Sequence, residues 1–194
     1  MERDSSAGVR RAVAALVGVF VLAGAAGASA QTGGSPAPGA PAGSAPPPSA
    51  PSVGKVRKAK LIHKSGRAIA PPGAPPAIVN AIAAGNAIHK RPYVWGGGHA
   101  SFTSWGYDCS GAVSYVLHAA GLLPSPQVSG SLMSWGLPGK GRWITVMASP
   151  SHTYAVIARR RFDTSSYGSG GSGPRWRATK RRARGFAVRH WPGY

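Results

Sequence analysis

Apolar residues recur at helical spacing in two segments of the chain, and each recurrence predicts a helix with one buried face. The first helix is predicted over residues 77–88, with Pro92 stopping it. Its expected buried face consists of Ile78, Val79, Ile82 and Ala83. The second is predicted to begin at Cys109 and to end at Gly121, a glycine in the position of a helix C-cap. Its expected buried face consists of Ala112, Val113, Val116, Leu117 and Ala120.

The pattern changes after residue 142. Four segments rich in β-branched and aromatic residues predict strands, at 143–147, 152–157, 161–164 and 185–190. The intervening residues 124–141 are rich in Pro, Gly and Ser, with Leu132, Met133 and Trp135 expected to reach the core. Because helices come first and strands afterwards, the order of elements predicts an α+β domain with an antiparallel sheet.

The first thirty residues have the features of a secretory signal. Arg10 and Arg11 precede an uncharged apolar run over 12–22, and Ala28-Ser29-Ala30 forms a small-residue cleavage site before Gln31. The alternative is an uncleaved anchor, although the run is barely long enough to span a bilayer. Cleavage would leave a secreted protein with no stable membrane span.

Residues 31–75 are dominated by Pro, Ala, Gly and Ser and include a cluster of Lys and Arg between 55 and 67. This composition predicts a semi-extended basic linker that contributes little to a core. A short strand at Leu61-Ile62-His63 is the alternative. The folded domain is therefore expected over residues 76–194.

The formal net charge of +19 implies anionic surroundings, such as nucleic acid, anionic lipid or an acidic wall polymer. The secretion signal argues against nucleic acid, as does the lack of a predicted helix with an interleaved basic and aromatic face. Cys109 is the only cysteine, so the chain forms no internal disulfide and no cysteine metal site. No metal or other cofactor is expected.

The position of Cys109 in the first turn of a helix favours a thiolate, because free amides and the helix dipole stabilise negative charge there. A lone thiol of this kind is a candidate nucleophile, and the alternative is a small buried apolar residue. Only two acids follow residue 4, Asp108 and Asp163. Asp108 suits a helix N-cap, whereas Asp163 falls inside an apolar strand pattern. His99 follows a glycine run and is expected to line a cleft.

His152 and Asp163 are expected to share a hairpin. If the turn centres on residues 158–159, Tyr154 lies opposite Asp163 and His152 becomes its diagonal neighbour, about 7–8 Å away. The turn lacks Gly and Asn, which leaves the register open. His190 on the last strand is an alternative partner for the histidine. Cys109, His152 and an orienting acid would together support acyl transfer through a thioester.

Three motifs give the chain a family resemblance. Tyr93-Val94-Trp95-Gly96-Gly97, then Asp108-Cys109-Ser110-Gly111, then Ser151-His152 before an apolar strand resemble the NlpC/P60 cysteine peptidases of bacterial cell walls. The resemblance covers residues 76–194. Ser134-Trp135-Gly136 and the segment 161–164 are similar to secreted actinobacterial members.

The resemblance implies a papain-like α+β core and an endopeptidase that cleaves stem peptides of peptidoglycan. It implies Cys109 as nucleophile, His152 as base, and a third polar residue at Asp163 or Thr164. It also implies that the amide of Cys109 helps to form an oxyanion site. Substrate-binding positions are implied at Tyr93, Asp108 and Ser110.

The chain departs from the family pattern at Ser151, where many members have Gly, and in its basic loops at 159–161 and 180–184. These loops and the linker are expected to hold the protein near anionic wall polymers. Two alternatives to the peptidase remain. One is a non-catalytic wall-binding module, and the other is an amidase or acyltransferase that uses the same Cys-His pair.

Overall fold

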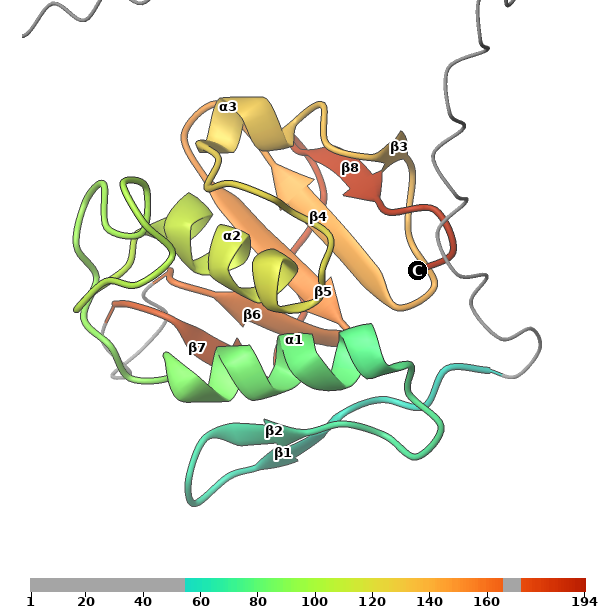
Figure 1. Ribbon diagram of the computed structural model, residues 1–194. Helices are drawn as coiled ribbons and strands as arrows, with labels where there is room; N and C mark the ends of the chain where they lie inside the picture. The colour runs from blue at the N-terminus through green and yellow to red at the C-terminus, as the bar shows by residue number, and fades with distance from the viewer. Residues whose placement is uncertain (1–54, 166–171) are drawn as a thin grey trace, which may run out of the picture. The chain divides into compact units, whose positions relative to one another are not determined.

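The computed structural model describes residues 55–165 and 172–194. The predicted signal sequence and the first part of the predicted linker lie outside these residues. The described chain combines helices with an antiparallel sheet (Figure 1), which confirms the predicted α+β class. Among the described helices, none has the length and apolar character needed to cross a bilayer.

A six-stranded sheet forms the centre of the fold, in the order β3-β8-β4-β5-β6-β7. Its strands are β3 (Leu137–Pro138), β4 (Ile144–Ala148), β5 (Thr153–Ile157), β6 (Arg160–Asp163), β7 (Arg175–Arg177) and β8 (Ala187–His190). The four predicted strands correspond to β4, β5, β6 and β8. The outer strands β3 and β7 were not predicted, because they are too short to show an alternating pattern.

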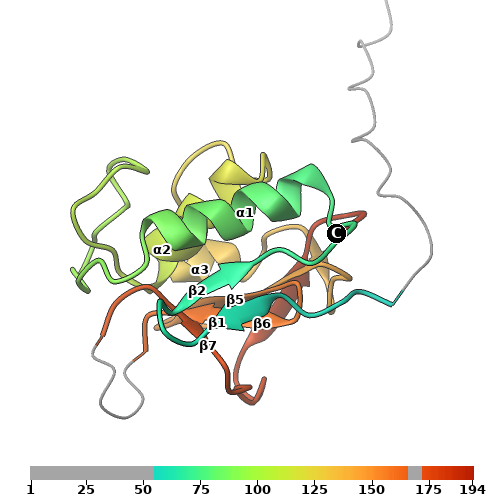
Figure 2. The ribbon, with the colours of Figure 1, turned by 90° about the horizontal axis from the view of Figure 1, so that it is seen from below.

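Three helices pack on one face of this sheet (Figure 2): α1 (Pro76–Ala87), α2 (Cys109–Ala119) and the single turn α3 (Ser129–Leu132). Helix α2 contacts β5 and β6, and α1 contacts α2 and β5. Strand alternation divides the side chains of the sheet between its two faces. Val146, Ala155 and Phe162 point into the helix-covered core, whereas Thr145, Tyr154 and Val156 do not belong to it.

The predicted buried face of α2 is confirmed, since all five of its apolar residues are buried. The prediction for α1 is half wrong. Ile78 and Ile82 are buried, but Val79 is 44% exposed and Ala83 is also exposed. The true face includes Gly85, where an added Cβ would collide with the Trp176 ring. Tertiary packing therefore selects small residues that a search for large apolar ones overlooks.

The predicted boundary at residue 76 is corrected by an additional hairpin. Strands β1 (Lys60–Ile62) and β2 (Arg67–Ile69) pair before the first helix. Val56, Ala59 and Ala68 are part of the hydrophobic core. The amide of Ala59 donates to the carbonyl of Ala158 at 3.0 Å. Isolated small apolar residues in a polar segment give no periodic signal, so the linker prediction extended too far.

The turn between β5 and β6 fixes the position of His152 relative to Asp163. Its central residues are Ala158 (φ 43°) and Arg159 (φ 61°), a pair of positive φ angles typical of a type I′ turn. Ala155 pairs with Phe162 and Ile157 with Arg160. This is the register predicted from a turn at 158–159, although neither turn residue is the Gly or Asn that such turns favour.

Arg159→Gly is expected to stabilise the fold by about 0.5–1 kcal/mol, because glycine adopts a positive φ without the steric cost of a Cβ. The measurement is the midpoint of urea denaturation. Arg159→Ala is the matched control, since it removes the same cation and retains the Cβ. Equal midpoints for the two variants would contradict the backbone explanation.

Candidate active site

Cys109 is the first residue of α2, and the preceding residue caps the helix. The carboxylate of Asp108 accepts a hydrogen bond from the amide of Gly111 at 2.8 Å. The Cys109 side chain is buried, with 7% of the residue exposed. Its thiol therefore lies at the positive end of a helix, which stabilises a negative charge, whereas its burial opposes one.

Glycines allow a loop to pack directly on this first helical turn. The amide of Asp108 donates to the carbonyl of Gly97 at 3.2 Å. A Cβ on Gly111 would overlap that same carbonyl oxygen, and a Cβ on Gly98 would approach the ring of Tyr107. The glycine run 96–98 thus serves close backbone packing, which holds the loop that contains Tyr93 beside the thiol.

His152 lies just before β5 and is held by a tight turn. Its amide donates to the hydroxyl of Ser149 at 3.1 Å, and its carbonyl accepts from the amide of Ser149 at 2.8 Å. The imidazole Nε2 lies 3.0 Å from Asp163 Oδ1. Because Nε2 faces the carboxylate, Nδ1 is the ring nitrogen that remains for Cys109, whose thiol lies near enough to raise the pKa of His152.

Of the three residues considered as partner of the histidine, the structure brings Asp163 to it. Thr164 is buried, and its hydroxyl has no hydrogen-bond partner within the described chain. His190 belongs to β8, where its ring lies 3.3 Å from the carbonyl of Gly139. The β5–β6 pairing explains this outcome, because it makes Asp163 the diagonal neighbour of His152 on one face of the sheet.

The charges of Cys109 and His152 favour each other. Burial by itself would raise the pKa of the Cys109 thiol, but hydrogen bonds from His152 and Ser129 lower it below its ordinary value. Burial by itself would lower the pKa of His152, but hydrogen bonds to Asp163 and Cys109 raise it to about 9. Both shifts stabilise a thiolate–imidazolium pair at neutral pH.

Asp163 is the fixed negative charge beside this pair. Its side chain is completely buried, which would raise the carboxyl pKa, yet hydrogen bonds from His152 and Ser165 hold that pKa well below its usual range. Arg161 and Arg181 approach the other carboxylate oxygen at 3.3 and 3.5 Å. The carboxylate thus remains ionised and can orient the imidazole.

The residues predicted to bind substrate differ in exposure. Tyr93 is 39% exposed, and its phenol pKa is raised by burial and by the nearby charges of Cys109 and Asp108. Asp108 and Ser110 are both buried and hydrogen-bonded to each other at 3.3 Å. His99 donates to Asp108 with Nε2 3.0 Å from Oδ2. Tyr93 and His99 are therefore the members of this group that reach solvent.

Three polar residues of the site were not predicted. The Ser129 hydroxyl lies 3.6 Å from the Cys109 sulfur. The Ser165 hydroxyl lies 3.1 Å from His152 Nε2 and donates to Asp163 at 2.9 Å. Arg181 donates to the Ser165 hydroxyl at 2.8 Å. The spacing of Ser165 two residues after Asp163 is a signal of local hydrogen bonding. Ser129, in the single turn α3, and Arg181, in a loop, belong to segments without a sequence pattern.

A buried thiol, an imidazole and an oriented carboxylate are the groups that nucleophilic acyl transfer requires. The thiolate can attack a carbonyl carbon, and the imidazolium can donate a proton to the departing group. The arrangement needs no further protein group for either step.

No family model matches the chain, and no curated protein does. Solved structures that resemble it include Rv1477, a hypothetical invasion protein of Mycobacterium tuberculosis, at 23% identity and a TM-score of 0.45 over 61% of this chain. The match covers 63% of that chain, less than two thirds of it.

Two mutants of the resuscitation promoting factor interacting protein RipA match similarly. One, altered at a histidine, gives 23% identity and a TM-score of 0.45, covering 63% of this chain and 67% of that one. The other, altered at a cysteine, gives 22% identity and a TM-score of 0.43, covering 61% of this chain and 66% of that one. Similarity at this level transfers no function.

The rate of Cys109 alkylation by iodoacetamide is expected to report a thiol pKa below the ordinary value of about 8.5. As the only cysteine, Cys109 gives an unambiguous signal. His152→Ala should raise this pKa more than Ser129→Ala, because the histidine hydrogen bond lowers it more strongly. The pH dependence of the rate constant measures the difference, and an unchanged profile in His152→Ala would contradict the proposed pairing.

Proposed function

We propose that this protein is a secreted cysteine endopeptidase that hydrolyses peptide bonds in the stem peptides of peptidoglycan. The observation that supports the proposal most directly is the contact between the buried Asp163 and His152, 3.0 Å apart, with Cys109 near enough to His152 to raise the pKa of the imidazole. The substrate class comes from the resemblance of the motifs around Tyr93, Cys109 and His152 to the NlpC/P60 peptidases.

In the proposed mechanism, the Cys109 thiolate attacks the scissile carbonyl carbon and forms a tetrahedral oxyanion. The backbone amide of Cys109 is proposed to stabilise this oxyanion. His152 then donates its proton to the departing amine, the carbon–nitrogen bond breaks, and a thioester remains. Neutral His152 next removes a proton from water, which attacks the thioester and releases the acid and the thiolate.

Asp163 keeps the imidazole correctly oriented and stabilises its protonated form. Tyr93 is proposed to contact the amine side of the substrate, since its phenol is near the thiol and partly exposed. Asp108 and Ser110 are proposed to support the substrate site indirectly, through the helix cap and the contact with His99.

A non-catalytic wall-binding module is a second candidate, favoured by the basic surface of the chain. The pKa shifts of Cys109, His152 and Asp163 argue against this module, because binding to the wall alone requires no shifted pKa at these residues. An amidase or acyltransferase would use the same pair and differ in the bond or acceptor.

Digestion of purified peptidoglycan should release stem-peptide fragments with the native chain and none with Cys109→Ala, as read by mass spectrometry. Asp163→Asn should lower kcat/KM by on the order of 10³-fold, because the imidazole loses its orienting charge. His190→Ala is the matched control and should retain full activity. Fragments from Cys109→Ala would overturn the proposal, and wall binding without fragments from the native chain would favour the binding module.

The alkaline limb of the kcat/KM profile should fall with an apparent pKa of about 9, because His152 must be protonated to donate to the leaving amine. Asp163→Asn should move this limb to lower pH, since the carboxylate raises the pKa of the histidine. His99→Ala serves as the comparison, because His99 contacts Asp108 and should leave the position of the limb unchanged. A limb that stays in place in Asp163→Asn would contradict the assignment of His152.

A further inference from the structure

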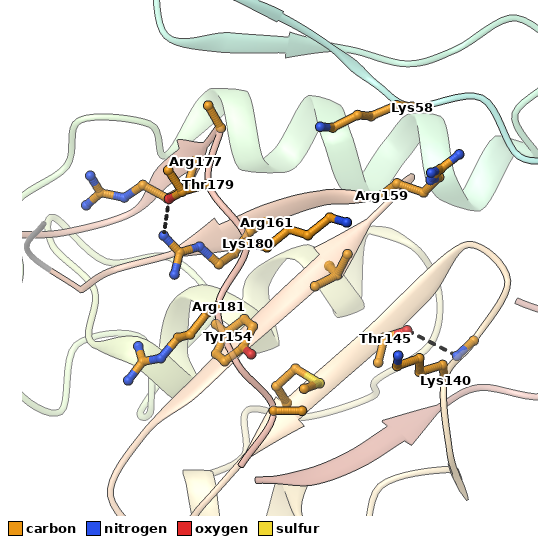
Figure 3. Close-up of a pocket in the computed structure, with 15 residues that line it drawn as sticks. Lys58, Lys140, Thr145, Tyr154, Arg159, Arg161, Arg177, Thr179, Lys180 and Arg181 are labelled. Carbon is orange, nitrogen blue, oxygen red and sulfur yellow. Dashed lines mark hydrogen bonds between the residues drawn. The ribbon is translucent and has the colours of Figure 1, made fainter. Parts of the chain in front are cut away.

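The sheet face directed away from the helices contains a pocket of about 410 Å³. Its floor includes Thr145, Tyr154 and Val156, which strand alternation turns away from the core. Seven of its fifteen lining residues are Lys or Arg, and none is Asp or Glu. Figure 3 shows the cationic side chains surrounding this floor. The pocket is therefore a concave surface of a single charge sign, and it lies outside the Cys109–His152 contact.

The cations converge from separate parts of the chain. Lys58 precedes β1, Lys140 precedes β4, Arg159 occupies the β5–β6 turn, and Arg177 and Lys180 come from β7 and the segment after it (Figure 3). Several independent segments thus bring like charges together, against their mutual repulsion. The proximity of Arg160, together with burial and the charge of Lys180, lowers the pKa of Lys58. A bound anion would relieve this repulsion.

The positive surface continues beyond the first pocket. An adjoining pocket shares Arg161, Thr179, Lys180 and Arg181 with it and extends to Arg182 and Arg184. A single phosphate ion would contact only part of such a surface. The continuity of the two pockets instead suits a chain of successive negative charges.

The aromatic residues of the two pockets make nucleobase stacking a poor fit. Tyr154 is only 1% exposed, and the guanidinium of Arg181 lies 5.5 Å from its ring centre. The same guanidinium lies 5.2 Å from the ring centre of Phe186. Binding of single-stranded nucleic acid normally uses open aromatic faces. The Tyr154 hydroxyl is buried as well, and it has no hydrogen-bond partner within the described chain.

We propose that these two pockets form a binding site for a linear, base-free chain of phosphate or phosphodiester groups. Arginine forks and lysine ammonium groups donate to the phosphate oxygens, and the exposed Thr179 lies among them. The site takes no part in the proposed peptidase chemistry, although its Arg161 and Arg181 contact Asp163. It assigns retention by anionic polymers to a defined face of the folded domain, where the basic loops at 159–161 and 180–184 meet Lys58 and Lys140.

The test measures equilibrium binding of the full chain, with Cys109→Ala introduced so that catalysis plays no part. The probes are inorganic polyphosphate and poly(glycerol phosphate), which distinguish free polyphosphate from a phosphodiester polymer. Single-stranded DNA and oligoglutamate of matched charge represent the competing classes. Triple substitution of Lys58, Lys140 and Lys180 by Ser removes three exposed cations of the pockets. Substitution of Lys60, Lys64 and Arg67 by Ser removes the same charge from the β1–β2 hairpin and is the matched control.

The pocket variant is expected to bind at least one of the two phosphate chains about tenfold or more weakly than the control, with a salt dependence reduced by about one unit per lost contact. Preference for one chain over the other identifies the source of the phosphate. Equal binding by the two variants would overturn the site. Equal or tighter binding of DNA or oligoglutamate would overturn the phosphate-chain assignment. If the native chain did not cleave peptidoglycan, the proposed peptidase function would be refuted, but this binding result would be unaffected. The two proposals can therefore be refuted separately.

Discussion

The candidate active site and the basic pockets both depend on the contacts of one buried group, the carboxylate of Asp163. It is one of two acids after residue 4 in a chain of net charge +19. On one side it holds the imidazole of His152, and on the other it balances Arg161 and Arg181. A neutral residue at this position would leave the buried Arg161 and the partly exposed Arg181 without their shared counter-charge, so the same substitution affects the candidate triad and the basic face together.

The first turn of α2 supplies a second constraint, set by backbone packing. Asp108 caps the helix with one carboxylate oxygen and accepts the amide of Gly96 with the other, at 3.1 Å. One side chain thus joins the helix that begins with Cys109 to the loop that contains Tyr93. Because a Cβ at Gly111 would push this loop away, the glycine and the aspartate act as a unit in placing the thiol.

The sequence was sufficient for the features that depend on local rules. Helix α2 was predictable from its apolar spacing and its aspartate cap. The pairing of His152 with Asp163 was expected only if the turn centred on residues 158–159, and the structure has that turn. Other features depend on tertiary packing. The face of α1 is chosen by Gly85 against Trp176, and the small residues of the 55–75 segment enter the core without periodicity. Arg181 reaches Asp163 from 18 residues away through a loop, and no local pattern encodes such a contact.

Side chains along strands β4 to β7 alternate between the two faces of the sheet. This alternation lets a small domain hold a helix-covered core on one face and the basic pockets on the other. Residues such as Val146 and Ala155 bury the sheet against the helices, while their neighbours Thr145, Val156 and Arg161 face the other way. Thr145 pairs with Val156, Val156 with Arg161, and Arg161 with Arg177, so this row runs across four strands. Two residues further along β6 lies Asp163. The sheet therefore places a row that ends in two arginines next to the buried carboxylate of Asp163, which also contacts the imidazole of His152.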